Sequence, residues 1–567
     1  MLRTILTSII VYFCSQLICV GNFSLLPKRK EMLLYNILTV FCLYSFFNIF
    51  FYDIRVSFLI VIAIFYLISL TMYYVHEFRG TNINLSDILS INTAKEVASG
   101  YAYEIKPMFI IFLALIIFEY VFQIVYNKIG VDLNSFLNSN LNIYRYFWYE
   151  VRQIILFFIS FFILKDKVSE KQYDYSLNAG ENEGYIYNFI SSLPLLHRTK
   201  KVEIASKEFL NNINTKSAHN FVNVKMRNLD RPHIIVIMNE SFGTAHTRIK
   251  TNMSVTPYYD SLSKVTKGNL YVNTFGGGTA NTEFEFLTGM TVGNYPYPVM
   301  PYNNFVKRDK YSIVRYFSSL GYKTIAMHPY TATNYHRNKV YKRFGFDKLL
   351  FFNDFKHKKY IRNYVSDKSM YEEVIRRFEN AIDASEKLFL FGITMQNHSG
   401  YKHFNEAKVL SLMTNYKNRE AVDSYLSLMK LSDEAIQILI DYFSNIDEHV
   451  MLLFFGDHNA SFGTEINKIV YEDNLNYECT NAYVTPFFIY DNKNKKDDFI
   501  DEISANFLSL ELLKRANLPL DYVHQMIDEI YKKYSVYNFH KAKSRKDGVL
   551  YDIPIDKFMM YERKYLK

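Results

Sequence analysis

A glycine-rich turn that ends in a threonine is the first stretch of the sequence that could do chemistry. Three consecutive glycines, Gly276 to Gly278, follow an apolar stretch at 269–275 that is typical of a strand, and Thr279 comes next. After Thr279 the pattern becomes helical. Glycine lets the backbone approach a ligand closely, and the free N–H groups at a helix start attract a phosphate. This layout would present the Thr279 hydroxyl as a nucleophile, and an ordinary helix cap is the alternative interpretation.

A carboxylate and an acid–imidazole pair stand at the ends of two other predicted strands. Glu240 follows one of these strands, and Asp457 and His458 follow the other. Such groups at the ends of buried strands need partners, because burying a charge without one is costly. Together with the Thr279 hydroxyl they form a mixed oxygen and nitrogen ligand set, which suits Mn²⁺, Zn²⁺ or Mg²⁺. Such an ion would lower the pKa of the hydroxyl and make Thr279 a nucleophile.

Further polar residues that could handle an anionic substrate follow the remaining strands. His328 comes directly after one strand, with Tyr335 and Arg337 shortly beyond, and His398 follows another strand. We expect Arg337, His328 and His398 to neutralise and position an anion. His398 is the candidate proton donor to a leaving oxygen, because imidazole titrates near neutral pH. Taken singly, the two histidines could be loop residues bonded to backbone, and Glu240 could be an acid at a helix start.

The elements that must position these residues follow an α/β pattern. Apolar strands are predicted at 233–238, 269–275, 324–327, 388–394 and 450–455. Helical patterns lie between them, among them 312–320, which Gly321 closes, and about 418–446. Apolar strands that alternate with helices predict a mostly parallel sheet covered on both faces. Ligands of such sheets bind at the carboxyl ends of the strands, so we expect the polar residues above to meet there.

The first part of the sequence predicts a membrane domain. Apolar runs of spanning length cover 4–26, 32–52, 56–75 and 107–126, and a fifth, more charged run covers 142–164. We predict three parts: a transmembrane domain of four to five helices at 1–165, a linker with helices at 166–230, and a catalytic domain at 231–567. With the catalytic domain outside, five spans contradict the positive-inside rule. Four spans, with the fifth run along the interface, satisfy it.

The net charge and the positions of the cysteines argue against a nucleic-acid-binding protein and against a disulfide-rich one. The net charge of +9 comes without an arginine-rich stripe, so it suits an anionic membrane surface and argues against a nucleic-acid partner. Cys14, Cys19 and Cys42 lie in the apolar N-terminal runs, which leaves Cys479 alone in the polar remainder. A disulfide framework in the C-terminal part is therefore excluded, and no CxxC spacing for a metal or redox site exists.

Five short motifs occur in succession along the second part of the chain. They are Asn239-Glu-Ser-Phe-Gly243, Gly276-Gly-Gly-Thr-Ala-Asn-Thr-Glu-Phe-Glu285, His328-Pro-Tyr330, Asn397-His398 and Gly456-Asp-His458. This set resembles the lipoteichoic acid synthase family, which are membrane-anchored phosphoglycerol transferases of the sulfatase/alkaline-phosphatase superfamily. The resemblance covers about 231–490 by motif. It implies a C-terminal α/β sulfatase-like domain behind an N-terminal α-helical transmembrane domain.

Carried over to the matching positions, the resemblance implies a metal site and a substrate site. The metal ligands would be Glu240, Thr279, Asp457 and His458. The ion would be Mn²⁺-like, with Mg²⁺ and Zn²⁺ as alternatives. Thr279 would also be the nucleophile. The groups around the phosphoglycerol would be His328, Tyr335, Arg337 and His398.

Two positions depart from the pattern of the family. Tyr335 stands where the best-known synthases carry a tryptophan, and Asn281 stands where they carry an aspartate. Both departures leave the expected metal ligands intact. They leave the identity of the donor and of the acceptor open.

The resemblance also implies an activity at the outer side of the cell membrane. The donor would be phosphatidylglycerol. Thr279 would attack its phosphorus, diacylglycerol would leave, and an acceptor hydroxyl would take the phosphoglycerol from the threonine. The acceptor would be a glycerol-phosphate polymer, a glycolipid or a glycan. The alternatives are a phosphoethanolamine transferase or a phosphodiesterase of the same superfamily, and a non-catalytic membrane protein that binds lipid or polymer. A sulfatase proper is excluded, because Thr279-Ala-Asn281 lacks the C/S-x-P-x-R setting that formylglycine needs.

Overall fold

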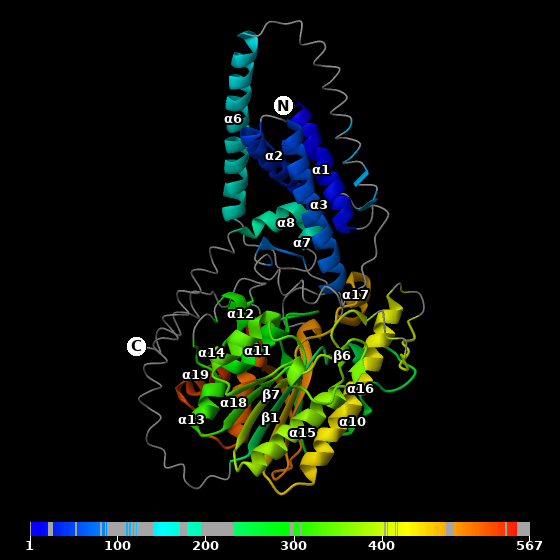
Figure 1. Ribbon diagram of the computed structural model, residues 1–567, viewed down its shortest axis with the longest axis vertical. Coiled ribbons are helices and arrows are strands. Elements are labelled where there is room, and N and C mark those ends of the chain that lie inside the picture. Colours follow the sequence, from blue (N-terminus) through cyan, green and yellow to red (C-terminus); the bar gives the residue numbers. More distant parts are fainter. Residues whose placement is uncertain are drawn as a thin grey trace. The chain divides into compact units, whose positions relative to one another are not determined.

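The described residues of the computed structural model fall into two compact units (Figure 1). They comprise 2–20, 26–51, 54–79, 140–170 and 179–193, a few positions between 82 and 121, and 231–552 with gaps, of which 295–299 and 472–480 are the longest. Apart from residues 78 and 79, the described residues up to 193 belong to the first unit, and those from 231 on belong to the second.

Helices make up the first unit. They are α1 (Leu2–Val20), α2 (Met32–Phe50), α3 (Ile54–Arg79), α6 (Asn140–Glu170), α7 (Ala179–Glu183) and α8 (Tyr185–Ser191). The side chain of Asn36 on α2 ties the last two to the others, because its Nδ2 donates to the Glu183 carbonyl (2.7 Å) and its Oδ1 accepts from the Tyr187 N–H (2.9 Å). Residues 179–191, which the sequence assigned to a linker, thus pack on the helices of this unit.

Two helices of the first unit are long and apolar enough to cross a membrane. They cover Met32–Phe50 and Val56–His76, whereas the apolar stretch of α1, Ile5–Cys19, is shorter. Membrane anchoring is therefore supported by two helices. The predicted multi-pass domain of four to five spans is not supported by the described residues.

The predicted spans at 142–164 and 107–126 are absent from this pair of helices for different reasons. The run at 142–164 lies in α6 and carries Glu150 and Arg152, which are costly in a bilayer core. The run at 107–126 lies largely outside the described residues.

The second unit is built on an eight-stranded sheet with the strand order β10-β2-β9-β8-β1-β7-β3-β4. The strands are β1 (His233–Asn239), β2 (Thr266–Tyr271), β3 (Lys323–Met327), β4 (Lys348–Leu350), β7 (Leu388–Ile393), β8 (Val450–Gly456), β9 (Val484–Asp491) and β10 (Asp498–Ser504). All neighbours pair in parallel except β9, which is antiparallel to both β2 and β8. The predicted mostly parallel α/β sheet is therefore confirmed.

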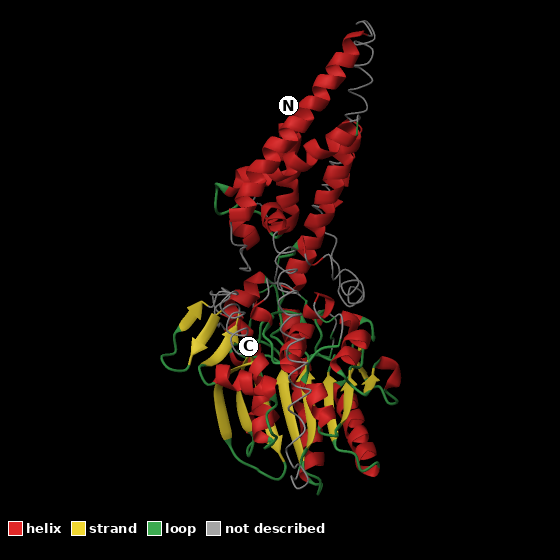
Figure 2. Ribbon diagram, turned by 90° about the vertical axis from the view of Figure 1, so that its left-hand side faces the viewer, coloured by secondary structure: helices red, strands yellow, loops and turns green. Residues whose placement is uncertain are grey.

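Helices cover both faces of this sheet (Figure 2). Along β1, Ile234, Val236 and Met238 pack into one apolar core with residues of α11 (Thr279–Thr288), α13 (Ile313–Ser319), α14 (Arg337–Phe344), α18 (Ala505–Arg515) and α19 (Tyr522–Tyr531). Alternate strand residues point to opposite faces. Ile235 and Ile237 must therefore face the other side, where they are equally buried. The other helices of the unit include α10 (Pro257–Ser261), α12 (Pro301–Asn304), α15 (Asp367–Asp383), α16 (Arg419–Ser444) and α17 (Thr464–Tyr471).

Two small sheets complete the second unit. The hairpin of β5 (Tyr360–Ile361) and β6 (Tyr364–Val365) is antiparallel. The strands β11 (Tyr534–Asn538), β12 (Lys541–Ser544) and β13 (Leu550–Asp552) form an antiparallel meander.

Gly456, the last residue of β8, allows the turn after β1 to lie against the strand. A Cβ atom at this position would overlap with the carbonyl group of Phe242. The carbonyl of Gly456 also accepts a hydrogen bond from Thr485 Oγ1 (2.8 Å) on β9, which fixes the strand from its other side. The glycine therefore sets how closely the end of β1 approaches the end of β8.

We predict that Gly456→Ala lowers the stability of the second unit by about 1–3 kcal/mol, because an extra methyl group must displace backbone. The midpoint of thermal unfolding of the purified protein measures this change. Gly321→Asn is the matched control, since an added Cβ at Gly321 meets no atom within 4 Å and asparagine tolerates its positive φ of 82°. Equal midpoints for Gly456→Ala and the wild type would contradict the close-approach argument.

Candidate metal and nucleophile site

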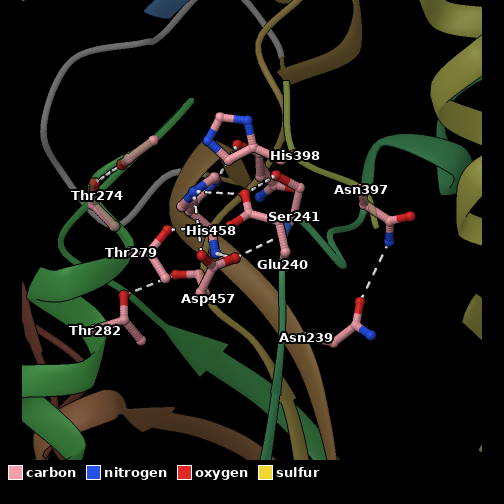
Figure 3. A network of polar contacts seen from close by, with 12 residues as sticks. Asn239, Glu240, Ser241, Thr274, Thr279, Thr282, Asn397, His398, Asp457 and His458 are labelled. Atoms are coloured by element: carbon pink, nitrogen blue, oxygen red, sulfur yellow. Dashed lines mark hydrogen bonds and ion pairs between the residues drawn. The ribbon is translucent and has the colours of Figure 1, made fainter. Parts of the chain in front are cut away.

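The ends of β1 and β8 bring two acids together. The strands are adjacent and parallel, and Asn239 pairs with Gly456 at their carboxyl ends. The next residue of each chain segment is therefore an acid at the same edge of the sheet, Glu240 on one side and Asp457 on the other. Ligand atoms of Glu240, Asp457 and His458 all lie within 4.8 Å of one another (Figure 3).

The hydroxyl of Thr279 belongs to the same cluster. Thr279 Oγ1 lies 3.3 Å from Glu240 Oε2 and donates a hydrogen bond to it. His458 Nε2 lies 3.5 Å from Glu240 Oε1 and 3.2 Å from Asp457 Oδ2. These side chains are almost completely buried, with Thr279 the most exposed of them at 6%. The structure thus brings together the residues that the sequence predicted as nucleophile and metal ligands, Thr279, Glu240, Asp457 and His458.

Ser241 links the two acids. Its backbone N–H donates to Asp457 Oδ1 (2.7 Å), and its Oγ donates to Glu240 Oε1 (2.9 Å). Ser241 has a φ of 52°, which is unfavourable for any residue other than glycine. The hydroxyl of Tyr425 donates a hydrogen bond to the carbonyl of Ser241 (2.8 Å). The strained backbone of Ser241 therefore aims both of its donors at the acids.

The imidazole of His458 is oriented by the backbone. His458 Nδ1 lies 3.1 Å from the carbonyl oxygen of Asn459, to which a neutral ring with a proton on Nδ1 donates. In that tautomer Nε2, which faces the acids, carries a lone pair. Neither His458 Nε2 nor Asp457 Oδ2 makes a hydrogen bond, although both atoms are buried. Two orphaned acceptors beside a second carboxylate fit a divalent cation, which the two carboxylates, the imidazole and the Thr279 hydroxyl would hold.

The glycine turn places Thr279 at the start of α11. Gly276, Gly277 and Gly278 all have positive φ values, and the Gly276 N–H donates to the Asn459 carbonyl (3.0 Å). Three residues into the helix, Thr282 Oγ1 donates to the carbonyl of Asp457 (2.8 Å). The turn and the helix are thus both tied to the segment after β8, and the free N–H groups of the first helical turn lie next to the cluster.

His398 lies next to the same cluster, beside Ser241 and His458 (Figure 3). It is half-buried, and its Nδ1 makes a hydrogen bond of 3.1 Å with the hydroxyl of Tyr364 on β6. Burial lowers the pKa of His398, and the charge of Glu240 opposes this shift. The predicted proton donor is therefore held in place by a residue that the sequence did not single out.

Arg337 and His328 form a separate buried network. Arg337 Nη2 pairs with Glu283 Oε1 on α11 (2.5 Å), and Arg337 Nη1 lies 2.9 Å from His328 Nε2. His328 Nδ1 faces the carbonyl of Ile393 (3.3 Å), so both of its nitrogens have partners. Burial and the charge of Arg337 hold the pKa of His328 well below its usual value, and the ring is neutral.

Tyr335 belongs to this second network as well. Its ring lies 5.0 Å from the guanidinium of Arg337, and its backbone has a φ of 50°. The predicted residues thus belong to two groups of hydrogen bonds and ion pairs, and the charge interaction of His328 with His398 shows that the two groups are neighbours. Glu240, Thr279, Asp457, His458 and His398 meet at the cluster, and His328, Tyr335 and Arg337 gather around Glu283.

Three residues that sequence reasoning missed act on the site. Ser241 joins the acids, Tyr364 holds His398, and the guanidinium of Arg362 donates to the carbonyl of His398 (2.5 Å). Ser241 lies within a recognised motif, but its role depends on an unusual backbone angle. Arg362 and Tyr364 lie on a short hairpin, far from any predicted strand end, so no sequence pattern pointed to them.

Residues 232–528, more than half of the chain, match the Sulfatase family. The chain belongs to the sulfatase family. This confirms the expected superfamily and its fold, and it makes the protein a member of an enzyme superfamily that is generally metal-dependent. The buried acidic and imidazole cluster of this chain is consistent with that property.

Two curated relatives of this sulfatase-family chain come from Rhizobium meliloti (strain 1021). One is named "Putative cyclic beta-1,2-glucan modification protein" and is 28% identical over 328 residues, which are 56% of this chain and 50% of the relative. The other is the "Capsular polysaccharide biosynthesis protein RkpI", 32% identical over 240 residues, which are 40% of this chain and 41% of the relative. The chain spans about half the length or less of these relatives.

A solved structure shares the fold. It is the Streptococcus pyogenes phosphoglycerol transferase GacH in complex with sn-glycerol-1-phosphate, which is 22% identical to this chain with a TM-score of 0.50. The match covers 65% of this chain and 92% of that chain.

Burial makes the two acids of the cluster hard to ionise in the absence of a cation. It raises the pKa of Glu240, and the neighbouring charge of Asp457 raises it further. Burial also raises the pKa of Asp457, while the charge of His458 and hydrogen bonds from Ser241 and Thr279 act in the opposite direction. The metal-free protein therefore favours the protonated acids, and a cation favours the ionised ones.

We predict that Mn²⁺ stabilises the protein more at about pH 8 than at about pH 5. A raised carboxyl pKa in the folded state contributes stability that is fully present below the unfolded value of about 4 and is lost as the pH rises through the folded value. The cation restores this loss because it takes the place of the protons. The shift in the midpoint of thermal unfolding on adding Mn²⁺ at both pH values measures the effect, with Glu240→Gln as the control that reduces it. An equal shift at both pH values is incompatible with two buried acids as ligands.

Proposed function

We propose that this protein is a membrane-anchored, metal-dependent phosphotransferase that moves phosphoglycerol from phosphatidylglycerol to a hydroxyl outside the cytoplasmic membrane. The observation that carries the proposal is the Thr279 hydroxyl at the start of α11, hydrogen-bonded to one acid of a buried Glu240, Asp457 and His458 cluster. A hydroxyl in this setting has no structural task that requires two acids and a histidine around it. It suits a nucleophile.

The side chains of the cluster would divide the work as follows. Glu240, Asp457 and His458 would hold a divalent cation, Mn²⁺ before Mg²⁺ or Zn²⁺, which when bound lowers the pKa of a nearby hydroxyl and offsets phosphate charge. The proton of Thr279 Oγ1 is directed at Glu240 Oε2. The N–H groups at the start of α11 would face the phosphate oxygens.

Two displacements at phosphorus complete the transfer. In the first, Thr279 Oγ1 gives its proton to Glu240 Oε2 and bonds to the phosphorus, the bond to the diacylglycerol oxygen breaks, and the protonated imidazole of His398 gives that oxygen a proton. In the second, the acceptor hydroxyl passes its proton to His398 and bonds to the phosphorus, the bond to Thr279 breaks, and Thr279 Oγ1 takes its proton back from Glu240. The hydrogen bond from Tyr364 would keep the His398 ring in position through both steps.

Three observations support the lipid donor and the acceptor class. The two apolar helices of the first unit would keep the enzyme at the membrane that contains the donor. The related proteins from Rhizobium meliloti are named for glucan modification and for capsular polysaccharide biosynthesis, which favours a glycan acceptor. The solved structure with the same fold is a phosphoglycerol transferase bound to sn-glycerol-1-phosphate.

Two enzymes with the same chemistry are the alternatives. A phosphoethanolamine transferase would use the same nucleophile and cation with a different headgroup, and a phosphodiesterase would let water take the phosphoglycerol from Thr279. Membranes that contain the protein, incubated with phosphatidylglycerol or phosphatidylethanolamine labelled in the headgroup, separate the three. We expect label from phosphatidylglycerol on a glycan, a glycolipid or a glycerol-phosphate polymer. Label from phosphatidylethanolamine on that acceptor, or release of free glycerol phosphate alone, would replace the proposal by one of the alternatives.

We predict that Thr279→Ala abolishes the release of diacylglycerol, with a loss of at least about 10³-fold, because the covalent step loses its nucleophile. Thr288→Ala is the matched control, since it deletes a buried threonine hydroxyl at the other end of the same helix, where Thr288 Oγ1 donates to the Phe284 carbonyl. Diacylglycerol release from phosphatidylglycerol by the purified, Mn²⁺-loaded protein measures both. Release by Thr279→Ala at the rate of Thr288→Ala would remove Thr279 from the mechanism.

A further inference from the structure

Arg362 is a cation next to the cluster, and it forms no ion pair with an acid of the described residues. We propose that Arg362 binds the phosphate of the substrate next to Thr279 and is a substrate-binding residue of this enzyme. The inference rests on one part of the proposed function, namely that the substrate carries a phosphate. It adds a residue that lies outside all the motifs recognised in the sequence.

The β5–β6 hairpin delivers Arg362 to the site. The residue is the first of the two loop residues between the strands, and it has a φ of 56°. Glycine is favoured at such a position, so an arginine there is unfavourable for the turn itself. Two residues later, Tyr364 holds His398 through a hydrogen bond of 3.1 Å. The hairpin thus serves the site at two points.

The hydrogen bonds of Arg362 leave its charge uncompensated. Nη1 donates to the carbonyl of Gly400 (3.1 Å), and Nη2 donates to the carbonyls of Gln396 (3.1 Å) and His398 (2.5 Å). The faces of Tyr364 and Tyr401 lie 5.4 Å and 5.7 Å from the guanidinium carbon. No carboxylate of the described residues forms an ion pair with it, and its Nε is buried without a hydrogen-bond partner.

The surroundings of Arg362 fit an anion as the missing partner. The hydrogen bond to the His398 carbonyl places the guanidinium next to the cluster. Burial lowers the pKa of Arg362, and the charges of Tyr401, Tyr364 and Glu240 oppose this shift. A partly buried cation that is held by neutral carbonyls gains most from an anion that it meets on binding. The phosphate of a substrate attacked by Thr279 is such an anion.

Arg337 offers the contrast. The sequence suggested Arg337, with His328 and His398, as a group that neutralises the substrate. The guanidinium of Arg337, however, already pairs with Glu283 and lies against His328. Its charge is compensated inside the protein. Arg362 forms no ion pair with an acid of the described residues, and its Nε–H has no hydrogen-bond partner.

A purely structural role for Arg362 is the competing explanation, because its hydrogen bonds also clamp the loop 396–400. The two roles differ in what a substitution changes. Loss of a clamp lowers the stability and disturbs His398, whereas loss of a phosphate ligand weakens the affinity for phosphate in a protein that is still folded.

The test is a titration of the full-length, detergent-purified, Mn²⁺-loaded protein with inorganic phosphate by isothermal calorimetry. The variants are Arg362→Met and Arg362→Lys. The matched control is Arg231→Met, because Arg231 likewise bonds a backbone carbonyl, that of Leu320 (2.5 Å), and lies over Tyr322, but it stands before β1 at the other end of the sheet. We expect Arg362→Met to weaken phosphate binding about tenfold or more, Arg362→Lys to weaken it less, and Arg231→Met to leave it unchanged.

Phosphate affinity of Arg362→Met equal to that of the wild type, or a wild type that does not bind phosphate, overturns the inference. If Arg362→Met unfolds at a much lower temperature, Arg362→Lys decides. Weaker phosphate binding with an unchanged unfolding midpoint supports the inference, and wild-type binding overturns it. Inorganic phosphate contains no glycerol, so the result does not depend on the donor. A wild type that binds phosphate but releases no diacylglycerol from phosphatidylglycerol would refute the proposed donor and leave the role of Arg362 standing.

Discussion

Glu240 and Asp457 are buried side by side at the edge of the sheet, and this placement is the constraint on which the rest of the site depends. Two carboxylates out of water repel each other and lose their hydration, so they persist only where donors and a cation compensate them. The neighbouring residues supply the hydrogen-bond donors, and the cation would have to be bound from solution. Ser241 adopts a strained backbone to donate to both acids, and the His458 ring turns Nε2 toward them.

The same constraint explains how Thr279 is placed. A hydroxyl that acts as the proposed nucleophile beside two buried acids requires a fixed position. The glycine turn and the first turn of α11 are fastened to the segment after β8 through the Asn459 and Asp457 carbonyls. Further along the helix, Glu283 is anchored by Arg337 and by the hydroxyls of Tyr302 and Tyr341. Arg337 therefore helps to hold α11 in position, and its charge is neutralised by Glu283 on that helix.

The two arginines show how burial divides roles between similar residues. Arg337 is completely buried beside an acid and forms an internal ion pair, and Arg362 is partly buried among carbonyls and aromatic rings and does not. A cation that already pairs with an acid inside the folded protein gains little electrostatic energy from an anionic ligand. A cation that is left without its counterion during folding can gain it on binding.

The sequence by itself determined the α/β class with its mostly parallel sheet, and it predicted Glu240, Thr279, Asp457 and His458 as metal ligands with Thr279 as the nucleophile. The strands β1, β3, β7 and β8 are continuous apolar runs that end in polar residues, and parallel strands collect such ends at one edge. It did not reveal β9, because Pro486 interrupts that run and proline is uncommon inside a sheet. It also left the number of spans at four or five, because the cost of Glu150 and Arg152 in a bilayer depends on what surrounds these side chains. Only the tertiary structure decided the partner of each arginine, the clamp made by Ser241 and the role of the β5–β6 hairpin. Those outcomes depend on contacts between residues far apart in the chain, and no local pattern of residue types records them.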